Sequence, residues 1–310
     1  RFIMPYSVAC LVVSLLLRSF RCTITDAFLF WALPTPDRLS YQPRNHTLPV
    51  CPQYEHSQIL PMTNKKSDLY GRINGLDTGG NTSIDVGVKW GAALLDPSLQ
   101  TVVTNLVASG DVESKFSHLP TSYTDPDSIK ILVVMTDGAN TSQYMLRDQF
   151  RSGNSDVWYS NTRETYAVRY NGKYYYQHND GDYQITTGNW TYNLHSSYQR
   201  LTFPQLFARV SNEYIDDILY ANIGSYNWDS GPRTYVGSGT KNSRLQSICN
   251  SVKDKGVIVY TIAFEAQPDG ETQLKACASS PSHYFDVDGL EISEAFSAIA
   301  QSISQLRLVQ

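Results

Sequence analysis

Two short polar segments carry residue types that bind divalent cations in other proteins. Residues 79–82, Gly-Gly-Asn-Thr, precede a stretch whose apolar residues are spaced as on a helix. Asp137 directly follows the mainly aliphatic run 131–136. A short aliphatic run of this kind is typical of a strand buried on both faces of a parallel sheet, and open α/β sheets place ligand sites at the carboxyl ends of such strands. The Thr82 hydroxyl and the Asp137 carboxylate are hard oxygen ligands, the kind that Mg²⁺ prefers. Because Asp-Gly is also a common turn dipeptide, Asp137 alone would be a weak signal.

The elements that must position these two residues alternate between helix and strand. Ile84, Val88, Ala92 and Leu95 follow one another at intervals of four, four and three residues, which places them on one face of a helix. The sequence predicts helices at 67–76, 84–95, 242–256, 271–279 and 290–306, and strands at 130–136, 257–264 and 282–287. This alternation, with no run of hairpins outside residues 142–241, predicts an α/β fold with a largely parallel sheet flanked by helices.

Residues 142–241 differ in composition from the rest of the chain and are interpreted as an insertion. Fourteen of the 21 tyrosines lie in this segment, together with three of the five tryptophans. So high an aromatic content argues against disorder, and short strands and loops are expected instead. The aromatic residues have two interpretations: a small separate core, or an exposed surface on which sugars stack.

Composition and motifs argue against nucleic-acid binding, lipid binding and catalysis. A net charge of −4 and a pI near 5.9 do not indicate the basic surface that binding to nucleic acid or anionic lipid requires. The chain contains no G-x-S-x-G, H-E-x-x-H or Walker sequence, so no enzyme is predicted and no catalytic residues are assigned. Cys277 and His283 are close in sequence, but nothing orients them for catalysis. His178, Asp180 and Asp182 lack the full calcium-loop pattern and are interpreted as solvated turn residues.

The five cysteines are Cys10, Cys22, Cys51, Cys249 and Cys277. None belongs to a C-x-x-C pair, which disfavours a zinc ribbon or a thioredoxin-type site. In an oxidising compartment we expect Cys22–Cys51 and Cys249–Cys277 disulfides, because each would join the flanks of a loop or neighbouring elements. Five buried, reduced thiols are the alternative.

Taken in order, several segments resemble von Willebrand factor A-type domains, and within these the TadG-like proteins of bacterial Flp (Tad) pilus assembly. The matching segments are ILPMT (59–63), INGLDTGGNTSIDVGVKWGAALLDP (73–97), KILVVMTDGANT (130–141), SICNSVKDKGVIVYTIAF (247–264), LKACASSPSHYFDV (274–287) and AFSAIAQSISQLRL (295–308). The resemblance implies a von Willebrand A-like, Rossmann-like domain formed by residues 1–141 and 242–310. Residues 142–241 would be a variable insertion within it.

The resemblance also implies a metal-ion-dependent adhesion site. In the family, an Asp-x-Ser-x-Ser loop after the first strand combines with a threonine and an aspartate from two further loops. Thr82 and Asp137 match that threonine and aspartate by position, but the chain has no Asp-x-Ser-x-Ser sequence. Residues 1–7 resemble the family's second strand, so the first strand and its loop would lie before Arg1. We therefore expect this chain to bind Mg²⁺ or a similar divalent cation weakly or not at all, whereas a longer parent could bind it.

The function that the resemblance implies is a non-enzymatic interaction module of the bacterial cell envelope. It would act at the periplasmic face of the inner membrane or at the cell surface and contribute to Flp/Tad pilus assembly. Its partners would be other pilus assembly or envelope proteins, not nucleic acid, and a membrane anchor would lie upstream of Arg1. An envelope location favours the two disulfides, with Cys10 as the spare thiol. The alternative is a surface adhesin or carbohydrate-binding protein that uses the aromatic insertion.

Overall fold

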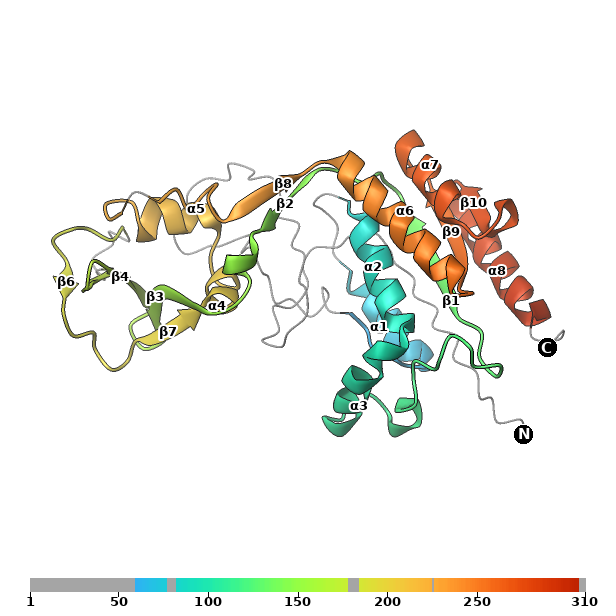
Figure 1. The fold of residues 1–310 in the computed structure, drawn as a ribbon, viewed down its shortest axis with the longest axis horizontal. Helices are drawn as coiled ribbons and strands as arrows, with labels where there is room; N and C mark the ends of the chain where they lie inside the picture. Colours follow the sequence, from blue (N-terminus) through green and yellow to red (C-terminus); the bar gives the residue numbers. More distant parts are fainter. Residues whose placement is uncertain (1–58, 77–81, 178–183, 225, 307–310) are drawn as a thin grey trace. The chain divides into compact units, whose positions relative to one another are not determined.

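A computed structural model describes residues 59–76, 82–177, 184–224 and 226–306 (Figure 1). The described residues form two compact units. One consists of residues 59–76, 82–142 and 237–306, and the other of residues 143–177, 184–224 and 226–236. The strand expected at residues 1–7 lies outside the described residues.

The first unit contains a three-stranded parallel sheet. Its strands are β1 (Ile131–Thr136), β9 (Ile258–Phe264) and β10 (Tyr284–Val287), in the order β1-β9-β10. Both pairings are parallel. Thr136 at the end of β1 pairs with Ala263 near the end of β9, so the two strands finish at the same edge of the sheet. The predicted α/β class with a largely parallel sheet is confirmed.

The helices of this unit are α1 (Lys66–Asn74), α2 (Ile84–Leu95), α3 (Gln100–Ala108), α6 (Ser238–Asp254), α7 (Pro268–Cys277) and α8 (Ile292–Leu306). All but α3 were predicted, with bounds that differ by a few residues. After α2, the Asp96 carboxylate accepts a hydrogen bond from the Ser98 amide at 2.9 Å and starts a 3₁₀ turn, Pro97–Leu99, that leads into α3. Pro97 therefore follows the end of α2 and begins the turn that leads into α3.

Apolar side chains bury both faces of the sheet. Successive side chains of a strand point to opposite faces of the sheet. In β1, Leu132 and Val134 point to one face, and Ile131 and Val133 point to the other. Helices α2, α6 and α7 cover the first face with a set of fully or almost fully buried residues: Ile84, Val88, Leu95, Leu245, Cys249, Val252, Leu274 and Cys277. Helix α8 covers the second face through Ala295 and Ile299. Burial on both faces explains why the strands consist almost entirely of aliphatic residues.

The second unit is antiparallel. Strands β2 (Gln143–Leu146) and β8 (Arg233–Val236) pair with each other. A five-stranded sheet has the order β6-β5-β4-β3-β7, formed by β3 (Asn154–Ser160), β4 (Thr165–Tyr170), β5 (Lys173–Tyr176), β6 (Trp190–Thr191) and β7 (Gln199–Thr202). Asn171 and Gly172 both have positive φ, at 48° and 77°, and form the two-residue turn between β4 and β5. Asn-Gly is the usual sequence of such a hairpin turn.

Short helical segments and a separate apolar core complete the second unit. The segments are α4 (Phe203–Phe207), α5 (Asn212–Tyr214) and a π-helical turn, Ile215–Leu219. Val157 and Val168 of the sheet and Ile215 of the turn are completely buried. Within the described residues, no helix of either unit has the length and apolar character needed to span a membrane.

Candidate functional site

Thr82 and the loop after β1 meet at the carboxyl end of the parallel sheet. The backbone carbonyl of Thr82 accepts hydrogen bonds from the amide of Thr141 at 3.1 Å and from its hydroxyl at 3.2 Å. The Thr82 side chain lies against Gly138, since a Cβ atom at position 138 would be 2.8 Å from Thr82 Oγ1. Segments that are more than fifty residues apart in sequence are thus in direct contact.

Asp137 lies in the bend that immediately follows β1, and its side chain is exposed. Its neighbours Thr136 and Gly138 form a tight local turn, in which the Gly138 amide donates to Thr136 Oγ1 at 2.9 Å. This turn leaves Asp137 at the carboxyl end of the sheet, next to the segment that carries Thr82. The surface formed by Thr82 and residues 137–141 is called the rim. The assignment of Asp137 as a metal ligand stays a prediction.

The described residues offer an incomplete donor set for Mg²⁺. No group of three or more His, Cys, Asp or Glu side chains in the described part of the chain is arranged to hold a metal ion. Thr82 and Asp137 contribute one hydroxyl and one exposed carboxylate. Mg²⁺ gives up its hydration shell reluctantly and requires near-octahedral oxygen geometry, so two such ligands do not fit a tight site.

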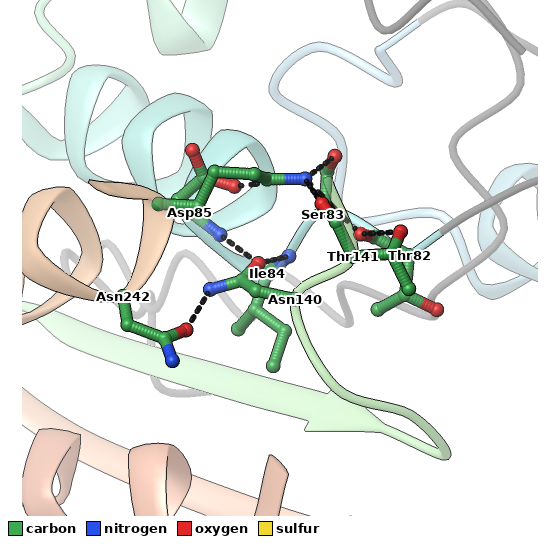
Figure 2. Close-up of polar contacts among 8 residues, drawn as sticks. Thr82, Ser83, Ile84, Asp85, Asn140, Thr141 and Asn242 are labelled. Atoms are coloured by element: carbon green, nitrogen blue, oxygen red, sulfur yellow. Dashed lines mark hydrogen bonds and ion pairs between the residues drawn. The ribbon is translucent and has the colours of Figure 1, made fainter. Parts of the chain in front are cut away.

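Asn140 links three elements around this rim (Figure 2). Its Oδ1 accepts hydrogen bonds from the amides of Ile84 at 2.7 Å and Asp85 at 3.3 Å, and these are the first amides of α2. Its Nδ2 donates to Asn242 Oδ1 of α6 at 2.9 Å. Asn242 in turn donates to the Asp269 carboxylate at 3.2 and 3.4 Å. Helix α2 is therefore capped by a residue of the strand-end loop and not by its own preceding residue, Ser83.

Helix α7 contacts the same loop through its backbone. A Cβ atom at Gly270, in the first turn of α7, would clash with the carbonyl oxygen of Gly138. The contact requires glycine at position 270, because only hydrogen leaves room for the carbonyl. It brings the exposed Asp269 close to the loop that carries Asp137, so the rim carries two exposed carboxylates from separate elements.

A buried ion pair lies beneath the rim. Lys241 of α6 is completely buried, and its Nζ is 3.7 Å from Oδ1 of Asp85, whose side chain is 5% exposed. Burial raises the pKa of Asp85, and the Lys241 charge counteracts only part of this increase. Burial likewise lowers the pKa of Lys241, with Asp85 opposing it. Neither residue is predicted from the sequence, because a lysine and an aspartate on two helices carry no local signal that they will meet.

One of the two expected disulfides is present, and it leaves Cys277 without the free thiol that a nucleophile requires. Cys249 of α6 and Cys277 at the end of α7 are bonded, which confirms that pairing. The Cys277 thiol is therefore unavailable to act with His283. The predicted Cys22–Cys51 disulfide and the residues His178, Asp180 and Asp182 lie outside the described residues.

Comparisons with known proteins give only distant structural similarities. No protein-family model matches the sequence, and no curated protein matches it. The chain is similar to the vWF domain of the type V pili tip protein Mfa5 from Porphyromonas gingivalis, with 17% identity, a TM-score of 0.35 and coverage of 79% of this chain and 74% of that one. It is also similar to the pilus adhesin SpaC from Lactobacillus rhamnosus GG, with 17% identity, a TM-score of 0.32 and coverage of 77% and 21%. For the adhesive tip pilin GBS104 from Group B Streptococcus agalactiae the identity is 13%, the TM-score 0.29 and the coverage 79% and 73%.

Proposed function

We propose that this chain is a non-enzymatic interaction module of a bacterial pilus system, located at the cell envelope, and that it contributes to Flp/Tad pilus assembly. The observation that supports the proposal is the convergence of Thr82 and the Asp137–Gly138 bend at one rim of a parallel sheet. The TadG-like resemblance of the segments that form this rim gives the pilus context.

The chemistry of the rim indicates what kind of partner it would accept. Asp137 and Asp269 are exposed, whereas Lys241 is completely buried and Arg244, a second cation near Asp85, is half-buried. An acidic rim of this kind attracts a basic group on a partner, and the attraction weakens as salt increases. We therefore propose a protein partner that presents lysine or arginine to this edge.

The proposal includes no catalytic step. His283 Nδ1 lies 2.5 Å from Ser280 Oγ, which is the arrangement of a nucleophile and its base. The other component of such a site is a carboxylate that orients the ring, and none is hydrogen bonded to His283 among the described residues. The ring packs against Tyr260 instead, with centroids 4.6 Å apart, which is a structural contact.

The test is a chromosomal Asp137→Ala/Asp269→Ala double variant in the source bacterium. We expect fewer assembled pili by electron microscopy at an unchanged protein level. The matched control is Asp127→Ala, since Asp127 is an exposed carboxylate in the loop before β1, at the opposite end of that strand. Normal piliation in the double variant, or an equal loss in the control, would refute a role for this rim.

A second candidate function is carbohydrate binding by the insertion. Trp190 and Tyr192 are 38% and 65% exposed, with ring centroids 5.0 Å apart, and large exposed aromatic rings are the groups on which sugar faces stack. Lys173 Nζ lies over one face of the Trp190 ring, 3.7 Å from its centroid, so a sugar would stack on the other face. Glycan-array binding that persists in chelator and is lost in Trp190→Ala, but not in Tyr235→Ala, would favour this function over the first.

A further inference from the structure

The ammonium group of Lys241 is enclosed by oxygen atoms from two loops and a helix. Its Nζ donates hydrogen bonds to the carbonyl of Thr82 at 3.2 Å, to Ser83 Oγ at 2.6 Å and to the carbonyl of Thr141 at 2.8 Å. The Asp85 carboxylate is the fourth oxygen neighbour, at 3.7 Å. An ammonium group has three N–H donors, and here each has an acceptor.

This environment is well suited to a cation, since every group that faces Lys241 Nζ in these contacts is an oxygen. Burying an ammonium group is strongly unfavourable unless it is paired and hydrogen bonded, and Lys241 has both a carboxylate neighbour and three acceptors. The acceptors are two carbonyls, one hydroxyl and one carboxylate, which is the oxygen donor chemistry that binds metal cations. The charged lysine therefore occupies, from within the chain, a position with the features of a small cation site.

The same contacts join the two segments that form the candidate site. Thr82 and Ser83 belong to the loop before α2, and Thr141 belongs to the loop after β1 that also carries Asp137. The direct contact between these loops includes the hydrogen bonds from Thr141 to the Thr82 carbonyl. Lys241 donates to both segments at once, so it fixes their separation from beneath the rim.

We propose that Lys241 is a positioning residue that acts as a built-in cation, holding the Thr82 loop and the 137–141 loop together without a bound metal ion. The inference rests on these contacts alone and stands apart from the pilus role. It has a consequence that an ordinary buried lysine does not share. Removing the side chain leaves a cavity lined by oxygen atoms, which a small cation from solution can enter.

The test uses the full chain and the variant Lys241→Ala, with amide hydrogen exchange read over residues 82–86 and 137–142. Because the loops lose three hydrogen bonds, we expect exchange there to accelerate by at least about tenfold. Methylammonium chloride should slow it again, whereas tetramethylammonium chloride at the same concentration should not, since that ion has no N–H donor. In the wild-type chain, chelator should leave exchange in both loops unchanged.

Three results would overturn the inference. One is unchanged exchange in Lys241→Ala, and another is equal rescue by both ammonium salts, which would be an ionic-strength effect. The third is loosening of the wild-type loops by chelator. Should Lys241→Ala not fold, Lys241→Gln provides the comparison, because its amide donates to two of the oxygens. Exchange in both loops should then be intermediate and insensitive to methylammonium, and unchanged exchange would again refute the role.

Lys130 provides a matched control in the same unit. It is 8% exposed, and its Nζ donates to two backbone carbonyls, those of Leu95 at 2.7 Å and Thr121 at 2.8 Å. Lys130→Ala should accelerate exchange near residues 95 and 121 and leave residues 82–86 and 137–142 protected. Equal loosening of the rim loops by both variants would show general destabilisation and contradict a specific role for Lys241.

Discussion

The side-chain oxygen of Asn140 accepts a hydrogen bond from the backbone amide of Ile84 at 2.7 Å, across 56 residues of sequence. Ile84 is the first residue of α2, and its amide has no partner within the helix. A loop at the end of β1 thus caps the helix that follows the Thr82 loop. The cap makes the geometry of the rim depend on α2, and the stability of α2 depend on the rim.

Asn140→Ala should destabilise the first unit by about 1–2 kcal/mol, because two amides of α2 lose their acceptor. Urea denaturation measures the loss, and amide exchange at Ile84 and Asp85 localises it. The control is Asn242→Ala, which removes the partner of Asn140 Nδ2 but leaves the cap in place. A loss in Asn242→Ala as large as that in Asn140→Ala would show that the cap is not the source.

Gly270→Ala should destabilise the chain by about 1–3 kcal/mol, because the added methyl group collides with the Gly138 carbonyl and forces α7 or the loop to move. Gly239→Ala is the matched control. Gly239 lies in the first turn of α6, and a Cβ atom there would have no atom within 4 Å. It should be neutral or slightly stabilising, since alanine favours helix. Thermal unfolding distinguishes the two, and similar melting temperatures would argue against the close contact.

The stability that Asp96 contributes should disappear in acid. Although burial works in the opposite direction, hydrogen bonds from Ser98, Lys255 and Tyr123 lower the pKa of Asp96 to about 2. The unfolded value is about 3.9, so the contribution is complete above about pH 5 and is lost as the pH falls towards 2. The side chain is 32% exposed, and after allowance for solvent screening we expect about 1 kcal/mol.

Urea denaturation of Asp96→Asn and of the wild-type chain at pH 7 and pH 2.5 measures this contribution. The variant should be less stable at pH 7, and the difference should shrink to about a third at pH 2.5, because the folded-state pKa of Asp96 is about 2. Asp127→Asn, at an exposed position, should match the wild-type chain at both values. A difference between Asp96→Asn and the wild-type chain that is the same at both pH values would show that the carboxylate charge is not responsible.

Titration calorimetry with Mg²⁺ should detect little heat with this chain. Thr82 and Asp137, the two predicted ligands, would supply one hydroxyl and one exposed carboxylate, too few to displace the water bound to the ion. Asp137→Ala serves as the matched variant. Micromolar binding that Asp137→Ala abolishes would contradict this expectation and would show that further ligands complete the site.

Thiol counting tests the disulfides. With Cys22–Cys51 and Cys249–Cys277 both formed, alkylation of the denatured, unreduced chain should modify one thiol, Cys10. Five modified thiols would refute both pairings.

The double variant Cys249→Ala/Cys277→Ala should lower the free energy of unfolding by about 2–4 kcal/mol, since the bond that joins α6 to α7 restricts the unfolded chain.

Local patterns in the sequence determined the main elements of the first unit. The spacing of Ile84, Val88 and Leu95 placed α2 correctly, because a buried helix face must repeat with the helix period. The aliphatic run 131–136 identified β1, and the alternation of helices and strands gave the parallel sheet. Helix α3 was missed, since Pro97 marks both the end of one helix and the start of another.

Only the tertiary structure decided which polar groups meet at the rim. Lys241 and Ser83 are 158 residues apart, and their contact depends on how α6 lies across the start of α2. Local sequence encodes local periods, such as the helix turn and the strand alternation, and the packing of apolar faces follows from them. The acceptor for a buried ammonium group, or the cap for a distant helix, is set by the crossing of elements, and no short stretch of residues records that geometry.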